Sequence, residues 1–170
     1  MPFHRRGRLT DETLAVLSDA SGADTITVAG ERGHHRVHTG PRPVQRPGPP
    51  IWIGGNGPAA IVRVNRFGTA RHPLHPSRQT CAAGVERLSA NTSFAPRVFF
   101  LPTERDVIAP DRPLGYGSLD QIGEDLQFLA GVGADTVVLD TDPGDQRLRR
   151  PFEDDLALVR LAGDRFARTM

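Results

Sequence analysis

The sequence predicts an α/β protein with parallel strands. Four short apolar runs with strand character, near residues 51, 70, 98 and 137, are each followed by a segment with helical periodicity, and a further helix precedes them. Strict alternation of strand and helix requires parallel strands joined by right-handed crossovers. The pattern fits an open doubly wound sheet and part of a barrel equally well. With 170 residues and 38% hydrophobic content, residues 1–170 are expected to form a single domain.

The N-terminal region predicts a helix followed by a hairpin. Residues 10–13 (TDET) offer a cap and an acidic first turn, and the helix is expected to end near Ser21 and Gly22. Alternation in residues 25–28, a turn at residues 30–33 and a second run at residues 36–38 predict the hairpin. Five prolines between Pro41 and Pro50 then predict an extended connector.

Three histidines in the hairpin raise the question of a metal site. They are His34, His35 and His38. Neighbouring residues of a strand point to opposite faces, and no carboxylate or cysteine completes a ligand set. We therefore expect exposed imidazoles and no metal.

The most informative stretch is residues 49–58, PPIWIGGNGP. Its apolar run of residues 51–53 predicts a strand, and Pro58 suits the first position of a helix that ends at Gly68. Between them lies a turn almost without Cβ atoms, Gly54, Gly55, Asn56 and Gly57, here called the glycine turn. A helix N-terminus has unpaired N–H groups and a favourable dipole, so an anionic group such as a phosphate can bind there. Most such turns only reverse the chain, and this reading stays open.

The remaining elements repeat the alternation. Ser77 is expected to cap a helix that carries Cys81, and residues 118–121 to cap a helix that ends near Gly131. Residues 97–101 and 136–140 predict strands, and the last helix is expected from Phe152 to about Arg168.

Other candidates for chemistry have simpler explanations. Asp140 and Asp142 follow the strongest strand, where barrel enzymes place their active sites, but acidic residues also form turns. Glu104 and Asp106 receive the same interpretation, and the lone Cys81 is expected to be an apolar filler. No histidine is placed by the sequence to activate Ser77 or Ser118. No catalytic residue is therefore assigned.

Charge and hydropathy exclude several partners. The formal net charge is +1, and no basic cluster lies on a regular helix, so we expect neither nucleic acid nor an anionic membrane as a partner. No run of 18 apolar residues occurs, and the segment MPFHRRGRL lacks an apolar core of a signal peptide. We expect a cytoplasmic protein.

Several segments in order resemble one known family. They are RGRLTDETLAVL, GPRPVQRPGPPIWIGGNGPAAIVRVNRFG, HPLHPS and SLDQIGEDLQFLAGVGADTVVLDT. Together they resemble the C-terminal half of the luciferase-like monooxygenases, the bacterial-luciferase superfamily, which includes oxidoreductases that use F420 or FMN. The resemblance implies a partial TIM barrel, roughly strands five to eight with their helices, in which residues 24–50 form a hairpin and proline-rich insertion.

The resemblance also implies a binding site. The family's phosphate and ribityl contacts fall on Gly54, Gly55, Asn56 and Gly57, so the expected cofactor is F420 or FMN, with a small organic molecule as substrate. The sequence departs from the family at Thr69, Ala70 and Arg71, where an acidic residue, glycine and tryptophan are usual. Arg71 thus replaces a bulky apolar wall. The family places most isoalloxazine contacts on its early strands, so the resemblance names no catalytic residue.

Three functions follow from this resemblance. The first is a flavin- or F420-dependent oxidoreductase domain completed by a second copy or by a complementary half-barrel chain. The alternatives are a non-catalytic remnant that keeps a phosphate-binding module, and a structural subunit. Four strands alone would expose an apolar face from residues 51–53, 98–101 and 137–139, which predicts a homo-oligomer or a complementary chain.

Overall fold

The structure is a computed structural model that describes residues 3–30, 33–142, 144–145, 147 and 149–167. It is an α/β protein, as predicted. A 3₁₀ turn at Phe3–Arg5 leads into α1 (Arg6–Gly22), the hairpin strands β1 (Thr25–Gly30) and β2 (Gly33–His38), and β3 (Trp52–Gly54). There follow α2 (Pro58–Phe67), β4 (Ala70–His72), α3 (Arg78–Val85), β5 (Ser93–Phe94), β6 (Arg97–Phe99), β7 (Leu101–Pro102), β8 (Tyr116–Gly117), α4 (Leu119–Gly131), β9 (Val138–Asp140) and α5 (Phe152–Phe166).

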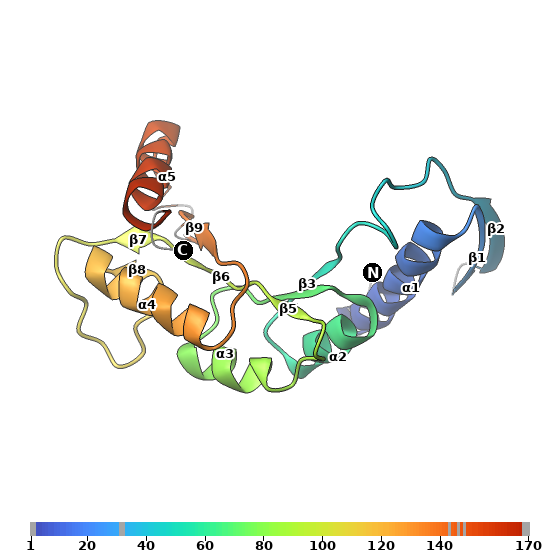
Figure 1. The fold of residues 1–170 in the computed structure, drawn as a ribbon, viewed down its shortest axis with the longest axis horizontal. Coiled ribbons are helices and arrows are strands. Elements are labelled where there is room, and N and C mark those ends of the chain that lie inside the picture. The colour runs from blue at the N-terminus through green and yellow to red at the C-terminus, as the bar shows by residue number, and fades with distance from the viewer. Residues whose placement is uncertain (1–2, 31–32, 143, 146, 148, 168–170) are drawn as a thin grey trace.

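The molecule is an elongated arc (Figure 1). The helix α1 and the β1–β2 hairpin form one end, and α5 lies at the other. The strands β3, β5 and β6 run between the two ends, with α2, α3 and α4 along the convex side of the arc. One layer of strands is therefore covered by one layer of helices.

Outside the β1–β2 hairpin, the paired strands are parallel and follow the order of the chain. In the first sheet β4 lies between β3 and β5, with Ile53 opposite Arg71 and Arg71 opposite Phe94. A bridge between Leu74 and Arg97 continues this sheet to β6, which pairs with β9. The prediction of four parallel strands is confirmed. The described strands form an open arrangement and no closed barrel.

The helix-covered face of the strands holds the core. Ile53 packs with Ala60 and Val64 of α2 and with Leu14 of α1. Farther along, Phe94 and Val98 pack with Cys81, Leu114 and Leu129. Cys81 is fully buried, which confirms it as an apolar filler.

The opposite face is less apolar than the sequence analysis expected. Trp52 is 44% exposed there, but Ile53, Val98 and Phe100, which were expected on the exposed face, are buried under the helices. Residues alternate between the two faces of a strand, so only every second apolar residue can reach the open side. The open face also carries the charged side chains of Arg97 and Asp140, which pair there.

Several element boundaries differ from the prediction, most clearly in α1 and in the strand expected at residues 97–101. The helix α1 begins at Arg6 rather than near Thr10, because the Thr10 hydroxyl donates to the carbonyl of Arg6 from inside the helix instead of capping it. The expected strand at residues 97–101 is split at Phe100, whose N–H donates to the Asp140 carbonyl. The last helix was expected to end at about Arg168, which lies outside the described residues. Glu31 and Arg32 of the predicted hairpin turn also lie outside them.

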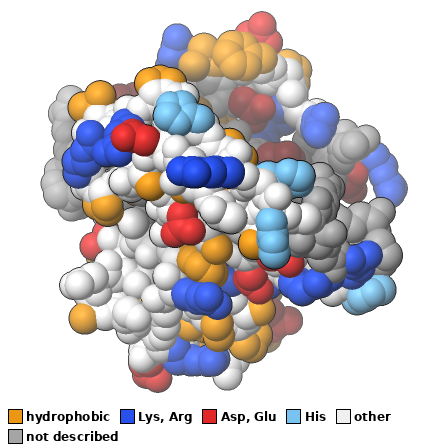
Figure 2. Space-filling view, turned by 90° about the vertical axis from the view of Figure 1, so that its right-hand side faces the viewer, with side chains coloured by type: hydrophobic (Ala, Val, Ile, Leu, Met, Phe, Trp, Pro, Cys, Tyr) orange, Lys and Arg blue, Asp and Glu red, His pale blue; other side chains and the backbone are white. Residues whose placement is uncertain are grey.

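The hairpin is confirmed. Its antiparallel register pairs Thr25 with His38 and Val28 with His35, and its three histidines are exposed. Figure 2 looks onto this end of the molecule and shows histidine and arginine side chains scattered among acidic and apolar ones, without a single basic patch. No helix of the described ranges is long and apolar enough to cross a membrane.

Both predicted serine caps are confirmed. Ser77 accepts a hydrogen bond from the N–H of Thr80 at the start of α3. Ser118 and Gln121 form a reciprocal capping box at the start of α4. Each hydroxyl has a structural partner, which fits their interpretation as caps.

Candidate functional site

The glycine turn joins β3 to α2 at the C-terminal edge of the sheet. Gly54 ends β3, Gly57 is the N-cap of α2, and Pro58 occupies the first helical position. All four residues of the turn are exposed. The helix begins without a side-chain cap. The N–H groups of Asn56 and Gly57 donate no hydrogen bond to any residue that the structure describes.

The glycines of this turn differ in how much they constrain it. Gly55 has φ +109°, a conformation that side chains disfavour, and a Cβ there would lie 3.4 Å from the Cβ of Ala60. A Cβ on Gly54 would lie 3.7 Å from the carbonyl oxygen of His72. At Gly57 a Cβ would meet no described atom within 4 Å. Only Gly55 is therefore required by the local backbone.

The side chain of Asn56 ties the turn to the segment after β4. Its Nδ2 donates to the Leu74 carbonyl at 2.8 Å, and the Leu74 N–H donates to its Oδ1 at 3.1 Å. Both ends of the amide are used, so Asn56 can offer a ligand only its backbone. The paired hydrogen bonds hold the turn against the neighbouring strand connection.

Two aromatic rings lie beside the turn on the open face. Trp52 of β3 and His72 of β4 have ring centroids 5.3 Å apart at an angle of 49°. The Nδ1–H of His72 donates to the Ala95 carbonyl at 2.6 Å, since a carbonyl oxygen can only accept. In the neutral ring Nε2 is then the acceptor.

A second cluster lies farther along the same edge. Asp140, the last residue of β9, accepts hydrogen bonds at Oδ2 from His75 Nε2 at 3.0 Å and from Arg97 Nε at 2.8 Å. The ring of His75 stacks on Phe99 with centroids 3.6 Å apart. His75 has φ +43°, which is unusual for a residue other than glycine. The stacking and the hydrogen bond together hold this conformation.

The charge of Asp140 is stabilised by these contacts. Burial alone would raise the pKa of this carboxyl group, but hydrogen bonds from Arg97, the Asp142 N–H and His75 outweigh burial and lower it. Asp140 is therefore an anion at neutral pH. The sequence analysis favoured a turn at Asp140; the Asp142 contact fits that view, but the pairing with Arg97 and His75 extends it.

A buried carboxylate that the sequence analysis did not single out organises the loop before α4. Asp125 is fully buried and receives two hydrogen bonds from Arg112, one from Arg78 and one from the Gly115 N–H. Asp125 lies one helical turn beyond the capping box of Ser118 and Gln121, and nothing in its local sequence marks it as buried. Only the distant arginines explain why it is buried.

Of the other acidic candidates, Glu104 is exposed, while Asp106 and Asp142 have structural partners. Asp106 accepts from the Ser118 hydroxyl at 2.5 Å, and Asp142 accepts from the Gly144 N–H at 2.9 Å. Among the described residues, no group of three or more His, Cys, Asp and Glu side chains could hold a metal ion.

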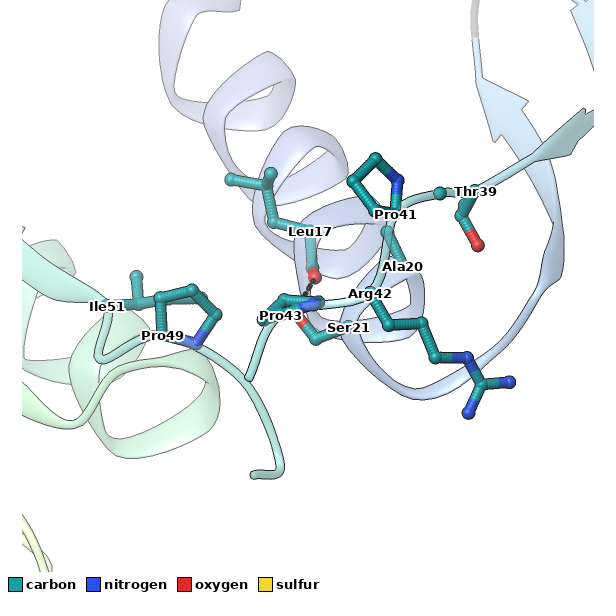
Figure 3. Close-up of a pocket in the computed structure, with 10 residues that line it drawn as sticks. Leu17, Ala20, Ser21, Thr39, Pro41, Arg42, Pro43, Pro49 and Ile51 are labelled. Carbon is teal, nitrogen blue, oxygen red and sulfur yellow. Dashed lines mark hydrogen bonds between the residues drawn. The ribbon is translucent and has the colours of Figure 1, made fainter. Parts of the chain in front are cut away.

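A hollow of about 330 Å³ lies away from the strand edge, between α1 and the proline-rich connector (Figure 3). Leu17, Pro41, Pro49 and Ile51 give it apolar walls. Its polar groups are engaged locally, since the Ser21 hydroxyl donates to the Leu17 carbonyl and Arg42 pairs with Asp24. The glycine turn does not contribute to it.

A model of the luciferase-like monooxygenase family matches residues 1–93, more than half of the chain. The chain belongs to the luciferase-like monooxygenase family. This is the family that the sequence resembles, and it is one of oxidoreductases and monooxygenases that typically bind flavin or F420. The match includes α1, the hairpin, the glycine turn, β4 and α3. No curated protein matches the chain.

The family match places the glycine turn inside the recognised region and leaves His75 as the only member of the Asp140 cluster within it. Sequence reasoning named the turn but missed His75 and Arg97. The one signal for the cluster was an aspartate at the end of the most strand-like run. Nothing in the sequence indicates which distant residues meet it.

Proposed function

We propose that this chain is a flavin- or F420-dependent oxidoreductase of the luciferase-like family, and that the glycine turn holds the phosphate of the cofactor. The observation that carries the proposal is the family match over residues 1–93, which includes the turn. An exposed, Cβ-poor turn at a helix N-terminus with unpaired N–H groups suits a phosphate.

The residues of this site would have different roles in cofactor binding. The N–H groups of Asn56 and Gly57 would donate to phosphate oxygens, while Gly55 keeps the backbone in a shape that other residues disfavour. The Asn56 amide, fixed to Leu74, would hold the turn in place. The bound flavin or F420 supplies the redox chemistry itself. The substrate proposed from family membership is a small organic molecule.

We further propose that the chain is a half-barrel. Four parallel strands in chain order, covered by helices on one side, support a partial TIM barrel, with residues 24–50 as an insertion. The exposed Trp52 and the unpaired edge of β3 support association with a second copy or with a complementary chain. A complementary chain would supply the early strands on which the family builds its isoalloxazine contacts, whereas a second copy would supply only a second set of the later strands.

A titration of the purified chain with FMN and with F420 tests the proposal. We expect saturable quenching of cofactor fluorescence for one of the two, and weaker binding of the same cofactor without its phosphate. Riboflavin serves as this control for FMN. Equal binding with and without the phosphate would contradict the phosphate role of the turn. Binding of neither cofactor, alone or in the presence of the other half-barrel, would contradict the proposed function.

A further inference from the structure

The strongest unexplained feature of the molecule is the burial of Arg71 in the middle of β4. Its side chain is 1% exposed, and its neighbours in the strand register are Ile53 and Phe94, both of which belong to the helix-covered core. Its guanidinium carbon lies 5.8 Å from the centre of the Phe94 ring. Arg71 therefore points away from the open face that carries Trp52 and Asp140.

This buried guanidinium has no hydrogen-bond partner for two of its nitrogens. Nε and Nη1 are both buried, and neither is bonded to any residue that the structure describes. Buried polar groups are nearly always hydrogen-bonded, because leaving one unpaired costs free energy, and an unpaired charge costs more. The other well-buried ionic groups, Asp125 and Asp140, follow this rule.

The described residues that influence Arg71 provide no negative charge. Burial lowers the pKa of Arg71, the nearby Cys81 opposes this change, and Arg87 adds to it. Burial also raises the pKa of the Cys81 thiol to about 11, although Arg71 counteracts it, so the thiol is neutral at pH 7. The two groups that act electrostatically on Arg71 are thus a neutral thiol, Cys81, and a second cation, Arg87.

Arg71 borders a cavity of about 280 Å³ between α2 and α3. Polar side chains from several segments line it: Asn56 before α2, and Gln79, Thr80 and Arg87 on or just after α3. Its lining contains two arginines and no carboxylate. Its volume lies just below the range of ordinary ligand pockets, which suits a small ligand.

The packing of α3 leaves room for the guanidinium at this position. A Cβ at residue 84 would overlap Nη1 of Arg71, and Gly84 is itself buried. A glycine at this position of the helix lets the charged group lie between the strand and α3. The same glycine lines the cavity.

We propose that the cavity between α2 and α3 binds a phosphate group, as inorganic phosphate or as a small phosphate monoester, with Arg71 as its buried counter-charge. Planar guanidinium groups bind phosphate through paired hydrogen bonds, and Arg87 adds a second charge. The amide of Gln79 and the hydroxyl of Thr80 supply further polar contacts. The cavity borders the glycine turn at Asn56, but the contacts proposed here come from side chains of β4 and of the α3 region and do not depend on the backbone N–H groups of the turn.

Thermal unfolding of the full chain in inorganic phosphate, and separately in glycerol phosphate, tests this site at constant ionic strength set with sodium chloride. We expect Tm to rise by roughly 5 to 10 °C when the ligand exceeds its Kd about 100-fold. The compound with the lower Kd in calorimetric titration identifies which source of phosphate the site takes. No rise with either compound would overturn the proposal.

Variants assign the effect to Arg71. Arg71→Met should abolish the response and should leave Tm in phosphate-free buffer unchanged or higher, because it removes an uncompensated buried charge. Gly84→Ala should also abolish the rise in Tm, because its Cβ would overlap Nη1 of Arg71, and this variant keeps the net charge of the protein. Arg36→Gln, a loss of charge on the exposed hairpin strand, should respond like the wild type. A full response in Arg71→Met, or in Gly84→Ala if the first variant does not fold, would overturn the proposal.

Discussion

His75 Nε2 donates to Oδ2 of Asp140 at 3.0 Å, although 65 residues separate the two. The first lies just after β4 and the second ends β9, so this hydrogen bond joins the two halves of the strand layer across β6. Arg97 of β6 donates to the same oxygen. One carboxylate thus links three successive parallel strand segments at their C-terminal edge.

Asp140→Asn should destabilise the fold at pH 7. The substitution removes the charge that Arg97 and His75 share, and we expect the free energy of unfolding to fall by about 1 to 3 kcal/mol in urea denaturation. Asp142→Asn is the matched control, with an expected change within about 0.5 kcal/mol, because Asp142 is exposed and accepts one local bond.

The stability of the wild type and the stability of Asp140→Asn should depend differently on pH. The contacts of Asp140 lower its pKa in the folded state, so its stabilisation is complete above the unfolded pKa of about 3.9 and is lost as the pH falls through the folded pKa. The gap between wild type and Asp140→Asn should therefore close in strong acid. A gap that stays constant down to pH 2 would contradict the assignment.

Gly55→Val should weaken binding of the phosphorylated cofactor far more than Gly57→Ala. The first replaces a residue at φ +109°, where a branched side chain distorts the turn, and the second adds a Cβ in open space. Fluorescence titration with FMN or F420 measures both, and circular dichroism checks that each variant is folded. Equal affinities in wild type and Gly55→Val would contradict the proposal that the glycine turn binds the cofactor phosphate.

Cys81 should make the protein sensitive to alkali. Its thiol has a pKa of about 11 in the fold, against an ordinary value of 9, so the folded state holds its proton while the unfolded chain loses it. This preference is fully present below pH 9 and is lost between pH 9 and 11, where unfolding becomes easier by about 2 to 3 kcal/mol. Cys81→Ala should lack that step. In the wild type a thiol reagent at pH 8 should react quickly only in urea.

Asp125→Ala should be one of the most damaging single substitutions. It would leave Arg112, which is nearly buried, without its carboxylate partner and with only carbonyl acceptors such as that of Tyr116, at an expected loss of about 3 to 5 kcal/mol in the free energy of unfolding. Asp120→Ala on the same helix serves as the control, because its side chain is 87% exposed and its pair with Arg165 should contribute below about 1 kcal/mol. Similar losses of unfolding free energy in both variants would show that the buried ion pairs of Asp125 stabilise the fold no more than an exposed pair does.

Trp52→Arg should reduce self-association. We expect the wild-type chain to elute as a dimer or larger oligomer in size-exclusion chromatography with light scattering, since Trp52 is exposed next to an unpaired strand edge. Val44→Arg adds the same charge at an exposed position of the proline-rich connector and should leave the mass unchanged. A monodisperse wild-type monomer at micromolar concentration would contradict the association.

Local signals in the sequence predicted the elements well. Pro58 and Gly68 delimit α2, and Ser77 and Ser118 cap their helices, because each effect operates within four residues. The start of α1 was missed because a threonine can bond backward into a helix as readily as it can cap one. The parallel order of the strands followed from strand and helix alternation alone.

Long-range partners could not be predicted. The burial of Asp125 depends on Arg112 and Arg78, and that of Asp140 on His75 and Arg97. An isolated acidic residue looks the same in sequence whether it meets water or a guanidinium. Arg71 was noted as a departure from the family, but its orientation toward the helices depends on the alternation of β4 and on the space above Gly84.

The order of the strands has a consequence for synthesis of the chain. Each main parallel strand is hydrogen-bonded to the one translated before it, so β4 can add to β3, and β6 and β9 can add in turn, as each leaves the ribosome. Only the pairing of β9 with β6 spans several elements, since β7, β8 and α4 lie between them in the chain. The hydrogen bond from His75 to Asp140 is formed only when β9 arrives, and it then fastens the finished layer.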